Sequence, residues 1–332
     1  MAISSQLGSS ALLPAGLGFR NVLINGDFKV WQRGTSKAMA TGSGTGYLAD
    51  RWTAARASYT SGGTVSRQTA SLDGFQYCSR VQRDSGNTST ATAWYFQTLE
   101  AVTSIPLANK PVTYSFYIRS GSNFSGSIKA LLYSGTGAEQ NNFPDNAITG
   151  STTIITSTLS LTTSWQRIVL YGNVPSTATQ LFVGFGWTPS GTAGASDYFE
   201  ITGVQLEQNT QPTPFEQRPI GVELALCQRY FVTHVFNVGG YSGFADSTTL
   251  FLCVGSFSPE MRIGPSLSPA PTASDFEVRR SGLTASSVTA ISVNTTPDLL
   301  RLTVTSSSLT AGAGGIFTSS SGTKYLYWSA EL

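Results

Sequence analysis

Histidine and cysteine are scarce in this chain of 332 residues, and their scarcity excludes several kinds of site. The single histidine, His234, lies in the apolar run 232–236, where a structural or surface role is expected. Cys78, Cys227 and Cys253 are far apart and show no CxxC or Cys/His spacing. We therefore predict no metal, no cofactor and no disulfide, with the cysteines packed as small hydrophobic residues.

Charge is also low, since charged residues make up 11% of the chain, against about 25% in ordinary globular proteins. The net charge is +2 and no polybasic run is present, which argues against nucleic acid as a partner. No apolar run approaches the roughly 20 residues of a membrane helix, and the N-terminus does not resemble a signal peptide. We expect that the protein is made in the cytoplasm and does not insert into a membrane. Low charge with high β content is typical of extracellular and virion structural proteins.

Catalytic motifs are missing as well. There is no GxSxG elbow, HExxH pair or P-loop. A glycosidase needs two carboxylates at a fixed separation, and no spacing singles out a pair among the acidic residues. A long repeat typical of β-helical depolymerases is also absent. We therefore expect a binding or structural protein rather than an enzyme.

Short alternating segments separated by Gly, Ser and Thr turns predict an all-β fold. The clearest is 111–119, where every second residue is apolar and would share one face of a strand. The other segments predicted as strands in the first two thirds of the chain are 75–82, 93–99, 127–133, 152–161, 165–174, 180–187 and 197–207. The segment 21–28 is predicted as a short strand that runs into a turn at Asn25 and Gly26. About nine or ten such strands predict a jelly-roll β-sandwich.

The segment 197–207 breaks its own alternation. Phe199 and Ile201 alternate in one phase and Val204 and Leu206 in the other, with the switch next to Gly203. One extra residue reverses every side chain that follows, so we predict a β-bulge near Gly203.

One stretch, 214–231, has helical spacing, and Pro219 suits a first helical turn. Val222, Leu226 and Tyr230 would form its apolar stripe.

The predicted elements divide the chain into four parts. These are an N-terminal attachment arm (1–19), a jelly-roll domain (20–210), a linker with a short helix (211–231) and a C-terminal β-sandwich domain (232–332).

The region 232–332 contains six further alternating segments, which predict the smaller sandwich: 231–238, 248–257, 274–280, 287–293, 298–306 and 323–331. Between them runs a long Pro-rich loop, 257–273, and loops of this length are either functional or disordered. Met261, Arg262 and Ile263 would form its exposed tip. The last strand has aromatic residues on both faces, which indicates cover by the core on one side and by a neighbouring subunit on the other.

Several separated motifs keep a recognisable order along the chain. They are NVLINGDFKVW from Asn21, PVTYSFYIRSG from Pro111, TSWQRIVLYGNVP from Thr163 and SDYFEITGVQLEQ from Ser196. Together they resemble the jelly-roll carbohydrate-binding modules of the family 4/9 type. The opening NGDF…WQRG…ADRW, followed by GVQLEQ and TPFEQRPIGVELALCQRY, resembles still more closely a group of bacteriophage tail-fibre and minor structural proteins. The resemblance covers roughly residues 20–231.

The resemblance implies a virion protein, made in the host cytoplasm and carried at the tail or periphery of the particle. Its first implied function is that of a tail-fibre adhesin, a homotrimer that binds a host-surface glycan or protein. The arm 1–19 would attach it to another virion protein. Two alternatives stay open: a non-adhesive structural part, such as a capsid decoration or tail-connecting protein, and a polysaccharide depolymerase.

The chain departs from the carbohydrate-binding modules at one point. Many of those modules have an acidic pair in the last strand, associated with a structural calcium ion. Here Thr202 and Gly203 replace the pair, and Asp27 is left without a partner carboxylate. We therefore expect no calcium site.

Binding residues are sought among aromatic and polar side chains on outward strand faces, because sugar rings stack on aromatic rings. The candidates in the first domain are Trp94, Tyr117, Arg119, Lys129 and Tyr133, which could instead fill a subunit interface. In a fibre anchored by its N-terminus the last domain lies furthest out, so Met261, Arg262 and Ile263 are the favoured host contacts. The candidates for the subunit interface are Leu226, Tyr230, Tyr325, Tyr327 and Trp328.

Overall fold

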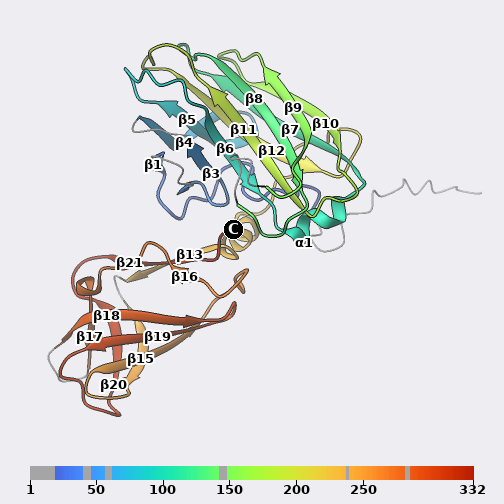
Figure 1. Cartoon of the computed structure of the whole chain (residues 1–332). Coiled ribbons are helices and arrows are strands. Elements are labelled where there is room, and N and C mark those ends of the chain that lie inside the picture. Colours follow the sequence, from blue (N-terminus) through green and yellow to red (C-terminus); the bar gives the residue numbers. More distant parts are fainter. Residues whose placement is uncertain (1–18, 40–45, 57–61, 142–147, 237–238, 281–284) are drawn as a thin grey trace, which may run out of the picture. The chain divides into compact units, whose positions relative to one another are not determined.

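The computed structural model describes residues 19–39, 46–56, 62–141, 148–236, 239–280 and 285–332. The chain is built almost entirely of β-strands, which confirms the predicted all-β class (Figure 1). It divides into two compact units, 1–220 with Leu332 and 221–331. This division lies inside the predicted linker and leaves 211–220 with the first unit. The predicted arm, apart from Phe19, lies outside the described residues.

The first unit consists of two six-stranded antiparallel sheets, in the manner of a jelly-roll sandwich. We call the first sheet the Glu200 sheet, after a residue of its strand β12. Its order is β1 (Ser36–Ala38), β4 (Gly63–Leu72), β5 (Phe75–Arg83), β12 (Tyr198–Glu207), β7 (Pro111–Ser120), β10 (Gln166–Asn173). The Trp94 sheet has the order β2 (Gly46–Tyr47), β3 (Thr53–Arg56), β6 (Ala93–Thr98), β11 (Gln180–Thr188), β8 (Ser127–Gly135), β9 (Thr152–Leu159). Between β6 and β7 the chain forms a short helix, α1 (Ala101–Ser104), and the 3-10 turn η1 (Ile105–Leu107).

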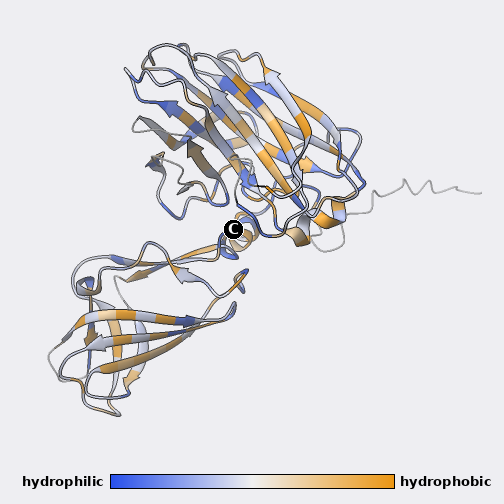
Figure 2. Cartoon of the chain, viewed as in Figure 1, coloured by the Kyte–Doolittle hydropathy of each residue, from blue (hydrophilic) through white to orange (hydrophobic). Residues whose placement is uncertain are grey.

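Alternation along the strands fills the space between the two sheets with large side chains. Tyr114 and Phe116 enter from β7, Phe185 and Trp187 from β11, and Phe199 from β12. The rings of Phe116 and Phe185 meet edge to face, with centroids 4.9 Å apart. Burial of a phenylalanine side chain such as Phe116, Phe185 or Phe199 contributes about 1.5–3 kcal/mol. Figure 2 shows the interleaved hydrophobic and hydrophilic residues along these strands.

The predicted bulge in β12 is confirmed. The short strand predicted at the start of 21–28 is wrong, whereas the turn predicted at Asn25 and Gly26 is present, with the Phe28 N–H donating to the Asn25 carbonyl at 3.2 Å. The register of β12 against β7 shifts between Thr202 and Gln205, and Gly203 has a φ of 60°. At the bulge, β12 lies next to Gly26 of the segment 21–28. The Gly26 carbonyl accepts a hydrogen bond from the backbone N–H of Val204 at 2.9 Å. A Cβ on Gly26 would lie 2.1 Å from the Val204 carbonyl oxygen. The segment therefore crosses the bulge as irregular chain, with Asn25 at a φ of 57°.

The second unit corrects the predicted smaller sandwich, because its strands close into a barrel. The barrel order is β14 (Tyr241–Ala245), β15 (Leu250–Ser256), β19 (Leu299–Ser306), β18 (Ser286–Thr295), β17 (Phe276–Arg279), β20 (Gly314–Ser319). A separate three-stranded sheet has the order β13 (Phe231–Phe236), β21 (Lys324–Ser329), β16 (Ser266–Leu267). The turn η2 (Ala273–Asp275) precedes β17.

Glycine lets neighbouring strands of the barrel approach closely. The ring is complete because β14 pairs with both β15 and β20; β14 contains Gly243, and β20 begins with Gly314 and Gly315. A Cβ on Gly243 would lie 2.0 Å from the Leu252 carbonyl oxygen, so only glycine permits that approach. Glycine also weakens the alternation signal of a strand. For this reason β14 and β20 are both absent from the strands predicted from the sequence.

The helix α2 (Ile220–Gln228) is shorter than the predicted stretch and buries a different face. Glu223 and Cys227 are its buried residues, whereas Val222, expected in the apolar stripe, is exposed. Among the described residues, no helix is long and apolar enough to cross a bilayer.

Candidate functional site

The NGDF…WQRG…ADRW motif forms a buried hydrogen-bond network in the first unit. The side-chain amide of Asn25 accepts from the Val30 N–H at 3.0 Å and donates to the Val30 and Asp50 carbonyls at 2.8 and 3.1 Å. The Asp50 carboxylate accepts from the backbone and side-chain N–H groups of Gln32, both at 2.7 Å. These motif residues therefore anchor the loops at the start of the fold.

The TPFEQRP motif ties the end of the first unit to its beginning. The Glu216 carboxylate accepts from the N–H groups of Arg20 and Asn21 at 3.0 and 3.1 Å. The Arg218 guanidinium donates to the carbonyls of Leu23, at 3.1 Å, and of Asn21. We call these two residues the clamp. The motifs that carry the resemblance are thus largely structural, and a binding site has to be sought elsewhere.

The structure divides the five candidates of the first domain between two sheets. Tyr117 and Arg119 lie on β7 in the Glu200 sheet, on the face opposite the core residues of that strand. Trp94, Lys129 and Tyr133 lie on β6 and β8 in the Trp94 sheet, again opposite the core residues. The five residues therefore belong to the two opposite outer faces of the sandwich and cannot form one site.

On the outer face of the Glu200 sheet, Arg119 is part of a cross-strand ion ladder. Glu200, which is 0% exposed, accepts from Arg80 at 2.6 and 2.8 Å and from Arg119 at 2.6 Å. The Arg80 guanidinium lies over the Tyr198 ring at 4.0 Å and that of Arg119 over the Trp165 ring at 4.8 Å. Opposite charges directly across strands stabilise a sheet. Arg119 therefore has a packing role.

Tyr117 also packs within the unit. Its ring centroid is 5.3 Å from that of Phe75, and Phe75 in turn lies 5.3 Å from Phe215. The Arg167 guanidinium lies 5.9 Å from the Tyr117 ring. The Tyr117 ring is thus engaged by side chains of the same unit.

The outer face of the Trp94 sheet is built differently, around two glycines of β11. Gly186 pairs with Trp94 on one side and with Lys129 on the other, so the three residues form one row across the sheet. A Cβ on Gly186 would lie 2.4 Å from Cζ3 of Trp94. The half-buried indole therefore lies across β11, and exposed Lys129 stands beyond it.

The neighbouring rows of this face contain buried apolar residues and, along β9, exposed threonines. Gly184 pairs with Phe96 and Leu131, and Phe182 pairs with half-buried Tyr133. The buried members of this cluster are Ala55, Phe96, Leu131, Ile148 and Phe182. Along the neighbouring strand β9, Thr153, Thr156 and Thr158 are exposed and pair with Tyr133, Leu131 and Lys129.

This face combines aromatic planes with hydroxyl and ammonium groups, which is the composition of a site for a polyhydroxylated ligand. Sequence reasoning identified Trp94, Lys129 and Tyr133 but missed Gly184 and Gly186. Two glycines at alternate positions of one strand were the available signal, because glycine inside a strand marks a close approach to its backbone.

In the second unit, the prediction that Met261 lies at an exposed loop tip is wrong, because Met261 is 0% exposed and belongs to the core. Its backbone N–H donates to the Pro297 carbonyl at 2.8 Å, which holds the Pro-rich loop against the barrel. Arg262 donates to the Ala330 and Glu331 carbonyls, both at 2.8 Å. Only Ile263, at 47%, is well exposed.

The predicted interface residues separate into buried and accessible ones. Tyr230 and Trp328 are buried and Leu226 is half-buried, so Tyr230 and Trp328 do not offer a surface to another subunit. Tyr325, at 44% exposure, stacks on Tyr327 on the outer face of β21, with ring centroids 5.9 Å apart. The last strand thus has one buried and one accessible aromatic face, as its sequence indicates.

His234 has the structural environment expected of it. Trp328 donates its indole N–H to Nδ1 of His234 at 3.2 Å, and the hydroxyl of Tyr241 contacts the same atom. An indole only donates, so Nδ1 is unprotonated and the ring is neutral. Burial lowers the pKa of His234 from its usual value of 6.5.

No set of metal ligands is found in the part of the chain that the structure describes, where no three His, Cys, Asp or Glu residues gather. Asp27, the remnant of the acidic pattern, forms an ion pair with Lys29 at 2.6 Å. The Thr202 hydroxyl donates to the Tyr77 carbonyl at 2.8 Å.

Comparison with known proteins finds no matching family model and no matching curated protein. Among solved structures, a putative sugar binding protein from Bacteroides thetaiotaomicron is 12% identical with a TM-score of 0.38, over 57% of this chain and 100% of that one. A CBM4 structure is 19% identical, TM-score 0.35, over 56% and 98%. The enzymatically active domain of bacteriophage CBA120 tailspike protein 4 is 15% identical, TM-score 0.37, over 57% and 21%. At TM-scores below 0.5 these likenesses carry no conclusion about the function of this chain.

Proposed function

We propose that this chain is a virion adhesin that binds a host-surface glycan on the outer face of the Trp94 sheet, without cleaving it. The observation that supports the proposal is the row formed by Trp94, Gly186 and Lys129, in which the indole lies across a strand that has no side chain there. Neighbouring strands are about 4.8 Å apart, so the aromatic and cationic residues of the row are separated by about two strand spacings.

The chemistry of the face suits a sugar. A pyranose presents a C–H face that packs against an aromatic ring, and hydroxyls that need polar partners. Trp94 and Tyr133 contribute half-buried aromatic rings to this face, while Lys129 and the threonines of β9 contribute donors and acceptors. A rigid sheet holds these groups in place before the ligand arrives, which lowers the entropy lost on binding.

The virion assignment is supported by the ordered motifs that resemble phage tail-fibre and minor structural proteins. In this proposal the protein is a homotrimer at the tail or particle periphery, attached through 1–19. A non-adhesive structural part is the alternative. Imaging of particles labelled on this protein, with competition between purified protein and phage for host cells, separates the two. A label on the capsid shell together with no competition would favour the structural role.

The glycan proposal is tested with arrayed host polysaccharides and the full chain. Trp94→Ala should weaken binding by more than about tenfold, as expected for truncation of a central aromatic contact, and Lys129→Ala by less. Tyr171→Ala is the matched control, because Tyr171 is an exposed aromatic residue on β10 of the other sheet. Equal binding by Trp94→Ala and the parent protein would rule out this face as the site.

A further inference from the structure

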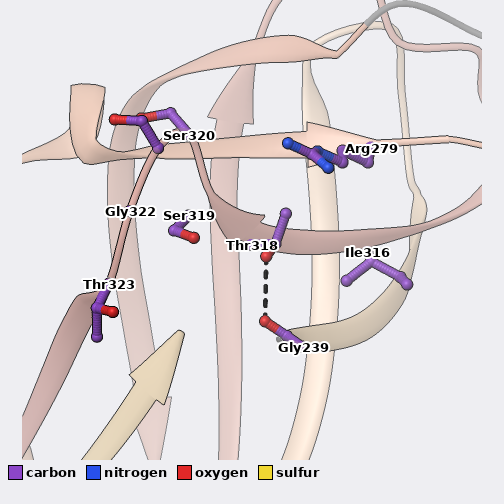
Figure 3. A pocket seen from close by; sticks show the side chains of 9 residues that line it. Gly239, Arg279, Ile316, Thr318, Ser319, Ser320, Gly322 and Thr323 are labelled. Atoms are coloured by element: carbon purple, nitrogen blue, oxygen red, sulfur yellow. Dashed lines mark hydrogen bonds between the residues drawn. The ribbon is translucent and has the colours of Figure 1, made fainter. Parts of the chain in front are cut away.

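The second unit contains a pocket of about 480 Å³ that none of the predicted site residues line. It lies between β17 and the connection from β20 to β21 (Figure 3). Its volume is within the range of about 300–1,000 Å³ that is usual for small-molecule sites. Its lining is dominated by hydroxyl groups, from Thr318, Ser319, Ser320, Ser321 and Thr323.

Two of these hydroxyls are already oriented. Thr318 donates its hydroxyl proton to the Gly239 carbonyl at 3.0 Å, which Figure 3 marks, and Ser320 donates to the Ser274 carbonyl at 3.1 Å. A hydroxyl has one proton and two lone pairs. With their protons engaged, Thr318 and Ser320 offer only acceptor positions. They therefore suit a ligand that brings its own hydroxyl donors.

Arg279 is the cation of the pocket. Its side chain is 63% exposed and pairs through Nε with Glu277. Its two Nη groups have no hydrogen-bond partner among the described residues. Guanidinium groups bind carboxylates through two parallel hydrogen bonds, so a carboxylate is the group best matched to these free donors.

The surrounding charges permit such a ligand. Lys324 forms an ion pair with Asp275 at 2.6 Å, next to the Ser320 backbone, which donates to the Asp275 carbonyl. The two carboxylates near the pocket, Glu277 and Asp275, thus each have a cationic partner. An incoming anion meets no unpaired acid there.

We propose that this pocket binds a sugar that bears a carboxylate, of the uronic-acid class. The Nη groups of Arg279 bind the carboxylate, the oxygens of Thr318 and Ser320 accept from ring hydroxyls, and exposed Ile316 packs against the C–H face of the ring. The site belongs to the second unit and does not depend on the glycan site proposed for the Trp94 sheet.

The test uses the full chain, labelled with ¹⁵N, and three probes: D-glucuronate, D-glucose and acetate. We expect glucuronate to shift the amide signals of 318–323 in a saturable manner, with a lower apparent Kd than either partial probe. Arg279→Gln should weaken glucuronate binding by roughly tenfold or more, since it removes a charge-assisted contact. Binding of glucose should be unchanged by that substitution.

Two further variants keep the result interpretable. Thr318→Val removes one hydroxyl while preserving the side-chain shape, and should weaken both glucuronate and glucose. Arg301→Gln, at an exposed arginine on β19, is the matched control and should change nothing. The proposal is overturned if glucuronate leaves 318–323 unshifted, if acetate binds as tightly as glucuronate, or if Arg279→Gln binds like the parent. The amide signals of 318–323 report only on this pocket. A loss of glycan binding by Trp94→Ala therefore has no bearing on the proposal for the pocket.

Discussion

The indole of Trp94 occupies the space that a side chain at Gly186 would need, with Cζ3 only 2.4 Å from the position of a Cβ. A residue of β6 and a glycine of β11, 92 positions apart in the sequence, therefore make one feature of the sheet surface. Because β11 has no side chain at Gly186, the Trp94 ring of β6 can occupy the space above that residue.

This relationship predicts the effect of Gly186→Ala. The added methyl group must displace the Trp94 ring, because the ring rather than the backbone is its nearest contact. We expect a loss of about 1–3 kcal/mol in the free energy of unfolding, typical of overpacking, and a loss of glycan affinity similar to that of Trp94→Ala. Urea denaturation and glycan binding measure the two effects. The control is Gly221→Ala, at a helical glycine with open space around it, which should not destabilise the protein.

The buried ion pair between Arg83 and Asp197 should be a major contributor to the stability of the first unit. The guanidinium donates to the Asp197 carboxylate at 2.8 Å and to the carbonyls of Asn87 and Ser89 at 2.6 and 3.0 Å. Arg83→Met would leave the buried carboxylate without its cation, which costs about 3–5 kcal/mol.

Urea denaturation of Arg83→Met measures that loss, with Arg301→Met as the exposed control. Adding Asp197→Asn to Arg83→Met should recover part of the stability, because the unpaired charge is then removed. A double variant less stable than Arg83→Met would contradict this account.

The stability of the second unit should depend on pH through His234. Burial lowers the pKa of His234 below 6.5, so at mildly acidic pH the unfolded chain binds more protons than the folded one. The free energy of unfolding therefore rises with pH between the lowered pKa and about 6.5 and is level above that window. As pH falls below about 6.5, the contribution is lost.

Unfolding curves at several pH values, compared with those of His234→Gln, isolate this contribution, since the chain has no other histidine. The difference in stability between parent and variant should shrink as the pH is lowered through the window. A difference that stays constant from pH 7 to pH 5 would show that His234 does not titrate on unfolding.

The clamp of Glu216 and Arg218 predicts where the first unit can be cut. A fragment comprising 1–220 keeps their contacts with Asn21 and Leu23, whereas a fragment comprising 1–210 loses them. We expect the longer fragment to unfold cooperatively and the shorter one to be several kcal/mol less stable, since each charge-assisted hydrogen bond contributes about 1.5–3 kcal/mol. Equal stability of the two fragments, measured by thermal and urea unfolding, would mean that the clamp is dispensable.

The proposed homotrimer can be tested at the accessible aromatic face of the last strand. If Tyr325 and Tyr327 are buried between subunits, the double substitution Tyr325→Ser and Tyr327→Ser should shift the mass measured by light scattering from three chains towards one. Tyr171→Ser, on β10 of the first unit, is the matched control. A parent protein that is monomeric at micromolar concentration would refute the proposed assembly.

Much of the fold follows from local pattern. The two-residue period of strands such as 111–119 determined which side chains face the core, and a single phase switch located the bulge at Gly203. Alternation of this kind is a property of neighbouring residues and depends on no distant contact. The all-β class and the position of one short helix near Pro219 follow in the same way.

Only tertiary structure decided which of these residues meet. Strand pairing joins segments far apart in the chain, so the separation of Arg119 from Trp94 into opposite sheets depends on pairing partners that no local pattern names. The same holds for Met261, which the Pro297 carbonyl fixes in the core. Sequence by itself determined the chemistry available to this protein, whereas long-range pairing and backbone hydrogen bonds decided which side chains remain accessible to a ligand.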